Sequence, residues 1–174
     1  MTERAGGVIH KGLSLTVIGD KLKVGDKAPN FEASDNLFSP EMVSFAESAG
    51  KVRLINVIVS VNTGVCDPQI RRFSEEIGKY GDDVVCYTVS VDLPIAQETW
   101  CSSAGIENIK MVSDYRDMAF GKAYGTYVKE LRVEQRSIFI VDADDTVRYV
   151  EYVPEFGQHP DYDAALAALE GVVG

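Results

Sequence analysis

The chain has 174 residues, of which 45% are hydrophobic and 25% charged, and its formal net charge is −10 at pH 7. A chain of this size can bury a full core in one domain, residues 1–174, without disulfides or a metal. The acidic charge disfavours nucleic acid and membrane partners. No apolar run is as long as a membrane span, and residues 1–11 contain no apolar run long enough for a signal peptide. We therefore expect a cytoplasmic protein.

The first part of the chain predicts a β-hairpin followed by short elements. Leu13 to Ile18 is the expected first strand, Gly19-Asp20 the turn and Lys21 to Val24 the second strand. A short strand is expected within Phe31 to Phe38, and a short helix over Pro40 to Ala49.

Two strand–helix units follow. Val52 to Val59 and Val84 to Val91 are near-continuous apolar runs, as expected of strands in a sheet covered on both faces. Each run precedes a predicted helix with a proline in its first turn, over Asp67 to Tyr80 and Pro94 to Ala104. This order is typical of an α/β protein.

The last third of the chain completes the prediction. We expect a strand at Ile109 to Val112, a short helix at Met118 to Tyr124, a hairpin of Ser137 to Val141 with Val147 to Val153, and a closing helix at Asp161 to Val173. The whole order predicts an α/β fold with a central mixed sheet flanked by helices and an N-terminal β-hairpin. The thioredoxin-like fold is one such arrangement.

The three cysteines are Cys66, Cys86 and Cys101. An odd number is not typical of a secreted disulfide framework, and no pair has C-x-x-C spacing, which disfavours a dithiol reductase. Cys86 lies in a predicted buried strand and is expected to be a core residue. The histidines, His10 and His159, have no ligand-like spacing, so no metal site is predicted.

The stretch Thr63-Gly64-Val65-Cys66 is the strongest functional signal. Since the next helix opens at Asp67-Pro68, Cys66 lies in its first turn, where free N–H groups and the helix dipole favour an anion. Such surroundings lower the pKa of a thiol from about 8.5 toward neutrality and favour the nucleophilic thiolate. The Thr63 hydroxyl can reach the same place. The motif predicts thiolate attack on a small substrate.

Several blocks of sequence occur in an order found in one known family. They are Leu22 to Phe31, Asn62 to Cys66, Arg71-Arg72-Phe73, Trp100-Cys101, Gly105 to Asn108, Ser113 to Asp117, Phe120 to Gly125 and Pro160 to Tyr162. Together they span nearly the whole chain and resemble the atypical two-cysteine peroxiredoxins of the bacterial thiol peroxidase type.

The resemblance implies a thioredoxin-like fold, a homodimer, and reduction of hydrogen peroxide or small alkyl hydroperoxides with electrons from thioredoxin. No metal, haem or flavin cofactor is implied. Cys66 would be the peroxidatic cysteine, with Thr63 as its hydroxyl partner and Arg136 facing the thiolate. Cys101 matches the resolving cysteine, which would convert the Cys66 sulfenic acid to an intramolecular disulfide.

The loop departs from the family pattern Pro-x-x-x-Thr-x-x-Cys. Val59 stands at the first proline position, and Gly64 stands where a second proline is common. Because proline fixes φ and glycine loosens the backbone, we expect a more mobile loop and a less shielded cysteine.

The residues leave other interpretations open. Cys101 could simply pack beside Trp100, and Arg136 could form a surface ion pair with Glu134 or Glu130. A disulfide needs Cα atoms within roughly 7 Å, so helices that hold Cys66 and Cys101 farther apart would have to unwind locally in each cycle. A peroxide-responsive redox sensor or regulatory binding protein on the same fold is the alternative function.

Overall fold

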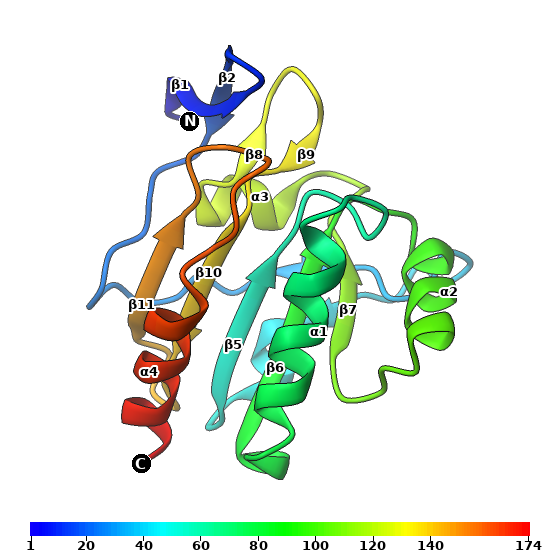
Figure 1. Cartoon of the computed structure of the whole chain (residues 1–174), viewed down its shortest axis with the longest axis vertical. Coiled ribbons are helices and arrows are strands. Elements are labelled where there is room, and N and C mark those ends of the chain that lie inside the picture. The colour runs from blue at the N-terminus through cyan, green and yellow to red at the C-terminus, as the bar shows by residue number, and fades with distance from the viewer.

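A computed structural model describes all residues from Met1 to Gly174 and shows a central sheet, a smaller sheet and covering helices (Figure 1). The strands are β1 (Glu3–His10), β2 (Leu13–Ile18), β3 (Glu32–Ala33), β4 (Val43–Ser44), β5 (Val52–Val57), β6 (Val84–Ser90), β7 (Lys110–Ser113), β8 (Tyr127–Val128), β9 (Val133–Glu134), β10 (Ser137–Val141) and β11 (Val147–Tyr152). The helices are α1 (Cys66–Ile77), α2 (Pro94–Ala104), α3 (Ala119–Tyr124) and α4 (Tyr162–Val173), with 3₁₀ turns at Phe45–Ser48 and Gly81–Asp83.

The central sheet has the strand order β11-β10-β5-β6-β7. β5, β6 and β7 run parallel, whereas β10 is antiparallel to both β5 and β11. The predicted mixed sheet is therefore confirmed, and with its flanking helices it forms the thioredoxin-like α/β fold. The two strand–helix units and the β10–β11 hairpin lie where the apolar runs predicted them, within about three residues at each end.

The two faces of the sheet carry separate apolar clusters because side chains alternate along each strand. Leu54, Ile138 and Ile140 pack with Phe73 of α1 and Leu169 of α4. Figure 1 shows these two helices over one face of the sheet. The other face carries an aromatic cluster that includes Phe31, Phe45, Tyr87, Phe120, Tyr124 and Phe139. Burial on both faces explains why the strand sequences are almost continuously apolar.

The N-terminal hairpin is confirmed, but its second predicted strand is wrong. β2 pairs with the preceding β1, not with Lys21 to Val24, and the turn is Lys11-Gly12, where both residues have positive φ. Gly19 follows the end of β2 and does not turn a hairpin; a Cβ there would collide with the backbone oxygen of Lys122 in α3. The chain packs closely at that point and needs a glycine.

The predicted helix over Pro40 to Ala49 is also wrong. Val43–Ser44 instead pairs with β3, and only Phe45–Ser48 turns, as a 3₁₀ segment. Ser44 and Glu47 form a capping box at its start, which gives the sequence the appearance of a longer helix.

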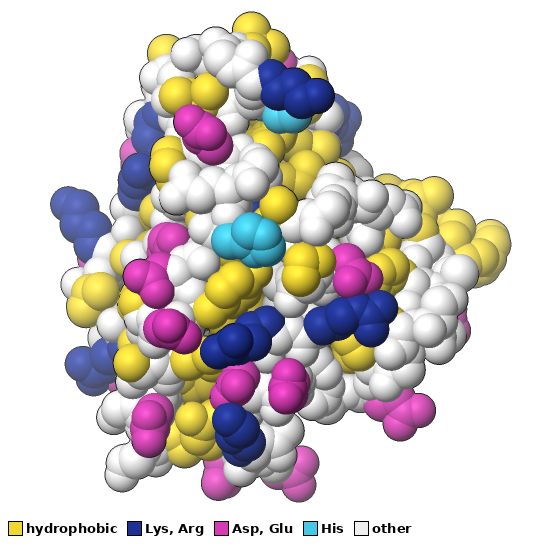
Figure 2. Space-filling model, in the orientation of Figure 1, with side chains coloured by type: hydrophobic (Ala, Val, Ile, Leu, Met, Phe, Trp, Pro, Cys, Tyr) yellow, Lys and Arg dark blue, Asp and Glu magenta, His cyan; other side chains and the backbone are white.

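The surface around α1 and α4 mixes both signs of charge. Figure 2 shows acidic and basic side chains interspersed over this face, and Arg72 contacts both Glu76 and Asp163. No helix is long and apolar enough to cross a membrane. No three His, Cys, Asp or Glu side chains gather as metal ligands would.

Candidate functional site

The segment between β5 and α1 turns twice before the helix begins, and these turns place Cys66. The Thr63 N–H donates to the Ser60 carbonyl at 3.2 Å, and the Cys66 N–H donates to the Thr63 carbonyl at 3.2 Å. Cys66 is the first residue of α1, and Val65 before it offers no side-chain cap. The predicted position is confirmed: the cysteine lies at the positive, uncapped end of the helix.

The sulfur of Cys66 has two polar neighbours. The Thr63 hydroxyl donates to Sγ at 2.7 Å, and Nη1 of Arg136 donates to it at 3.1 Å. The Cys66 residue itself is 0% exposed. Two donors on a buried sulfur stabilise a thiolate, because charge-assisted hydrogen bonds are stronger than neutral ones.

Arg136 is a buried cation without a carboxylate partner. It is 1% exposed, and no salt bridge of the molecule includes it. Nη1 also donates to Oε1 of Gln69 at 2.6 Å, and Nη2 donates to the carbonyl of Phe156 at 2.9 Å. The alternative of a surface ion pair with Glu134 or Glu130 is therefore wrong. Neutral acceptors orient the guanidinium but leave its charge for a thiolate at Cys66 to balance.

Further buried side chains hold Gln69, the residue that accepts a hydrogen bond from Arg136. Nε2 of Gln69 donates to Oδ1 of Asn56, and Nδ2 of Asn56 donates to the Thr88 hydroxyl at 3.2 Å. All three residues are 0% exposed. The row ties α1 to β5 and β6 and fixes the direction of the Gln69 carbonyl.

Sequence reasoning missed Gln69 and Asn56, although each left a signal. Gln69 follows Cys66 by three residues, which puts both on one side of a helix. Asn56 is a polar residue between Ile55 and Val57 in the strand β5, and such a residue needs a hydrogen-bond partner when buried. The contact from Phe156 is a backbone carbonyl and leaves no sequence signal.

A hollow of about 400 Å³ opens beside Thr63 and Arg136. Besides these two residues it is lined by His10, Val59, Gly64, Val65, Leu131, Val133, Phe156 and Gly157. Most of the wall is apolar, so a small molecule with one polar end would fit it. Val59 and Gly64 both line the hollow, but the predicted loss of shielding is wrong, since Cys66 remains fully buried.

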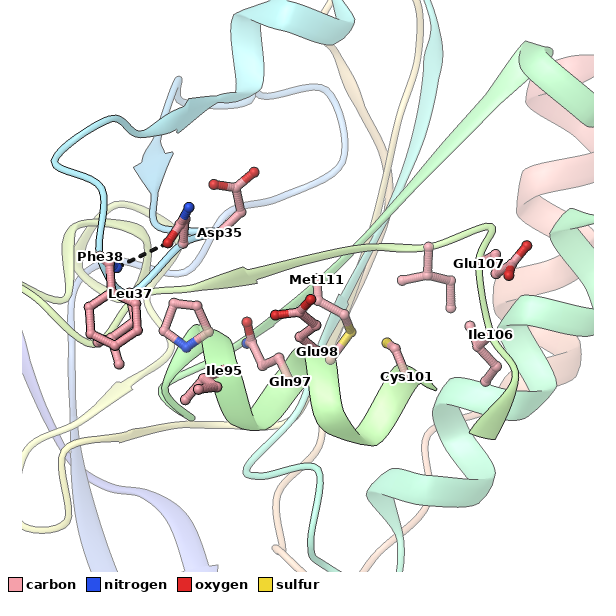
Figure 3. Close-up of a pocket in the computed structure, with 13 residues that line it drawn as sticks. Asp35, Leu37, Phe38, Ile95, Gln97, Glu98, Cys101, Ile106, Glu107 and Met111 are labelled. Carbon is pink, nitrogen blue, oxygen red and sulfur yellow. Dashed lines mark hydrogen bonds between the residues drawn. The ribbon is translucent and has the colours of Figure 1, made fainter. Parts of the chain in front are cut away.

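Cys101 lies in a different hollow, of about 460 Å³, formed by α2, the strand β7 and the segment Asp35 to Phe38. Its side chain points from α2 into this space (Figure 3). Cys101 is partly exposed, and its burial raises the pKa of its thiol. The structure thus brings together Thr63, Cys66 and Arg136, and leaves Cys101 apart as a free thiol.

An apolar cluster connects the surroundings of the two cysteines. Ile58, Val61 and Ile70 pack around Cys66, and Trp100, the neighbour of Cys101, packs against the same cluster. Trp100 therefore has a packing role of its own, and Cys101 faces the adjacent hollow.

Cys86 is a core residue, as predicted. It is 2% exposed in the cluster under α1 and α4. Burial raises the pKa of its thiol to about 12, so this cysteine stays protonated and unreactive.

Comparison with known proteins agrees with this geometry. The Redoxin family model matches residues 23–166. The chain is 50% identical over 166 residues to a thiol peroxidase of Halalkalibacterium halodurans, covering 95% of this chain and 98% of that protein. It is 48% identical to the thiol peroxidase of Bacillus subtilis, with the same coverage. Among solved structures, a peroxiredoxin-like protein from Aquifex aeolicus superposes with a TM-score of 0.86 at 30% identity, covering 97% of this chain and 98% of that one.

Proposed function

The chain belongs to the redoxin family, within its thiol peroxidases, and on that premise we propose that Cys66 is the thiol that attacks the peroxide. The protein is a peroxidase that works through redox-active cysteines. One observation carries the assignment to Cys66: the Thr63 hydroxyl and the Arg136 guanidinium both donate to its sulfur.

In the first step, the Cys66 thiolate attacks one oxygen of the peroxide. The S–O bond forms as the O–O bond breaks, and the second oxygen leaves as hydroxide or alkoxide and takes up a proton. Arg136 stays charged and has several donors, so it stabilises the charge that builds on the leaving oxygen. The product on the enzyme is the sulfenic acid of Cys66.

Thr63 has a second acceptor within reach, which suits this chemistry. Its hydroxyl lies 2.7 Å from Cys66 Sγ and 3.0 Å from the carbonyl of Ser60. Because a hydroxyl has one proton and two lone pairs, it can donate to either acceptor and accept from the peroxide O–H at the same time. Thr63 thereby orients the substrate oxygen toward the sulfur.

The hollow beside the site supports hydrogen peroxide and small alkyl hydroperoxides as substrates. Thr63 and Arg136 offer polar contacts for the O–O group, and Val59, Val133 and Phe156 offer apolar contacts for an alkyl group. Relative kcat/KM values for hydrogen peroxide and tert-butyl hydroperoxide measure how much this apolar wall contributes.

We assign Cys101 as the resolving cysteine. Its thiol attacks the sulfenic sulfur of Cys66, a disulfide forms and water leaves. Thioredoxin then reduces this disulfide by thiol–disulfide exchange. The partial exposure of Cys101 supports the assignment, because a reductant must reach one of the two sulfurs.

A homodimer and a cytoplasmic location complete the proposal. Both rest on the likeness to thiol peroxidases, and reducing conditions in the cytoplasm would keep free thiols such as Cys66 and Cys101 reduced. Sedimentation velocity measures the oligomeric state, and a single monomeric species at micromolar concentration would contradict the dimer.

The test is a peroxidase assay coupled through thioredoxin and thioredoxin reductase to NADPH. The native chain should turn over many times, Cys66→Ser should be inactive, and Cys101→Ser should consume about one peroxide per chain and stop, because its sulfenic acid cannot be resolved. The matched variant Cys86→Ala should retain turnover. Equal rates for the native chain and Cys66→Ser would refute the assignment. A native chain that reacts once without recycling would indicate a redox sensor instead.

A further inference from the structure

Asp92 lies where the segment that carries Cys66 meets the segment that leads to Cys101. On the Cys66 side, the Ser60 hydroxyl donates to Oδ1 of Asp92 at 2.7 Å, and the Val61 N–H donates to Oδ2 at 2.9 Å. Ser60 is also the residue whose carbonyl lies 3.0 Å from the Thr63 hydroxyl. The Asp92 carboxylate thus fixes the start of the loop that positions Thr63 and Cys66.

On its other side, Asp92 is connected to α2. The Ser90 hydroxyl donates to Oδ2 of Asp92 at 2.7 Å, and Nε2 of Gln97 donates to the Ser90 oxygen at 3.0 Å. Gln97 is 1% exposed and lies one helical turn before Cys101. The Ser113 hydroxyl donates to the backbone carbonyl of Asp92 and holds the turn against β7.

The Thr63 N–H donates to the Ser60 carbonyl at 3.2 Å, so hydrogen bonds connect Thr63 through Ser60, Asp92 and Ser90 to Gln97. Asp92 takes part in no salt bridge, so donors from these segments alone satisfy its carboxylate. Hydrogen bonds to a charged acceptor are among the stronger ones in proteins. Movement of either segment away from the other must break at least one of them.

Disulfide formation requires such a movement. Cys66 is fully buried in the cluster with Ile58, Val61 and Ile70, whereas Cys101 faces a hollow that Cys66 does not line. The sulfurs can form a bond only after the start of α1, or α2, leaves its present position. Both of these elements are tied to the same carboxylate.

We propose that Asp92 is a positioning residue that holds the loop of Cys66 and the start of α2 together for the peroxide step and must release one of them for the disulfide step. The inference rests on the proposed roles of Cys66 and Cys101. In this proposal, Asp92 speeds the peroxide step and slows the disulfide step. Loss of the carboxylate should slow the attack on peroxide, because Thr63 is less well placed, and should speed the condensation of the sulfenic acid with Cys101.

The experiment follows both steps in the reduced full-length protein after rapid mixing with hydrogen peroxide. Samples are quenched with acid, alkylated and analysed by mass spectrometry. Loss of the Cys66 thiol reports the first step, and appearance of the Cys66–Cys101 linkage with release of water reports the second. Trp100, the only tryptophan and the neighbour of Cys101, gives an independent fluorescence signal for the second step.

Asp92→Ala should slow the first step and accelerate the second, each by about tenfold to a hundredfold, as expected for the loss of hydrogen bonds to a charged group. Ser90→Ala removes the link from Asp92 to Gln97 and leaves the bonds of Asp92 to Ser60 and Val61 in place, so it should accelerate the second step and slow the first less than Asp92→Ala does. It also keeps the test informative if Asp92→Ala does not fold. Asp142→Asn is the matched control, since Asp142 accepts several donors in the β10–β11 turn, away from both cysteines. This control should change neither rate.

Two results would overturn the proposal in distinguishable ways. If the native chain forms the linkage and the Asp92 and Ser90 variants do not form it faster, the role of Asp92 is wrong and the proposed function stands. If the native chain never forms the linkage, the resolving role of Cys101 is wrong, and the role of Asp92 is wrong with it.

Discussion

Nη1 of Arg136 lies 3.1 Å from the sulfur of Cys66, and no carboxylate pairs with this guanidinium. A buried cation without an acidic partner favours a negative charge beside it. Cys66 is in contact with it and can carry that charge. The contact joins residues 70 positions apart in the sequence, and the proposed reactivity of Cys66 depends on it.

Replacing Arg136 with lysine should lower the second-order rate constant for hydrogen peroxide by about 10²-fold, because one ammonium group cannot reach the sulfur, Gln69 and the Phe156 carbonyl together. Stopped-flow measurement of Cys66 oxidation gives this constant. Arg72→Lys is the control: Arg72 is 45% exposed on the same helix as Cys66, and its salt bridges are worth little. A lysine variant at position 136 with the native rate would show that the guanidinium is not required.

Removal of the Thr63 hydroxyl should slow the same step by about tenfold to a hundredfold, the effect expected for one hydrogen bond to a charged group. Thr63→Val keeps the shape of the side chain and loses both the donor and the acceptor. Thr63→Ser keeps the hydroxyl and should retain most of the rate. If the valine and serine variants react equally fast, the contact with Sγ has no part in the chemistry.

Gly64→Ala should stabilise the protein by about 0.4–1 kcal/mol, because it restricts the unfolded chain without straining the folded one. Gly64 is outside the positive-φ region, and a Cβ there would meet no atom within 4 Å. Gly125→Ala should instead destabilise the protein, since Gly125 has a φ of 67° and a Cβ there would collide with the backbone of Asp20. Urea unfolding measures both free energies. A destabilised Gly64→Ala would show that this glycine is required in the loop.

Folding stability should fall as pH rises, because of Glu134. This residue is 0% exposed and accepts a hydrogen bond from the Thr126 hydroxyl. Burial, and then the charge of Asp114, raise the pKa of Glu134 well above its ordinary value. The folded state therefore binds the proton more tightly than the unfolded state, and its stabilisation is lost as pH rises from the ordinary carboxyl pKa through the raised one.

Urea unfolding between about pH 5 and about pH 9 checks this dependence. Glu134→Gln resembles the protonated acid and cannot ionise, so its stability should depend less on pH than that of the native chain. Parallel pH profiles for the two proteins would contradict the raised pKa of Glu134.

The parts of the site that are local in sequence could be predicted, and the distant parts could not. Cys66 and Thr63 were evident because one loop and the first turn of one helix contain both. Arg136 is contributed by a segment that only the folded sheet brings near, so its role came from the resemblance to a family. Gln69 carried a weak signal of helical spacing, and the carbonyl of Phe156 carried none.

In the fold, too, the elements with a clear local pattern were predicted and those without one were missed. The strands β5 and β6 were predicted because burial on both faces makes most of their residues apolar. β1 was missed because Gly6 and Gly7 weaken its strand pattern, and the structure shows an irregular register there, between Arg4 and Val8.

The most direct test of the account labels the sulfur that receives the peroxide oxygen. Cys101→Ser protein is reduced, treated with one equivalent of hydrogen peroxide in the presence of dimedone, digested and analysed by mass spectrometry. We predict the adduct on Cys66 and none on Cys86. An adduct on Cys86, or no adduct while peroxide is consumed, would contradict the account.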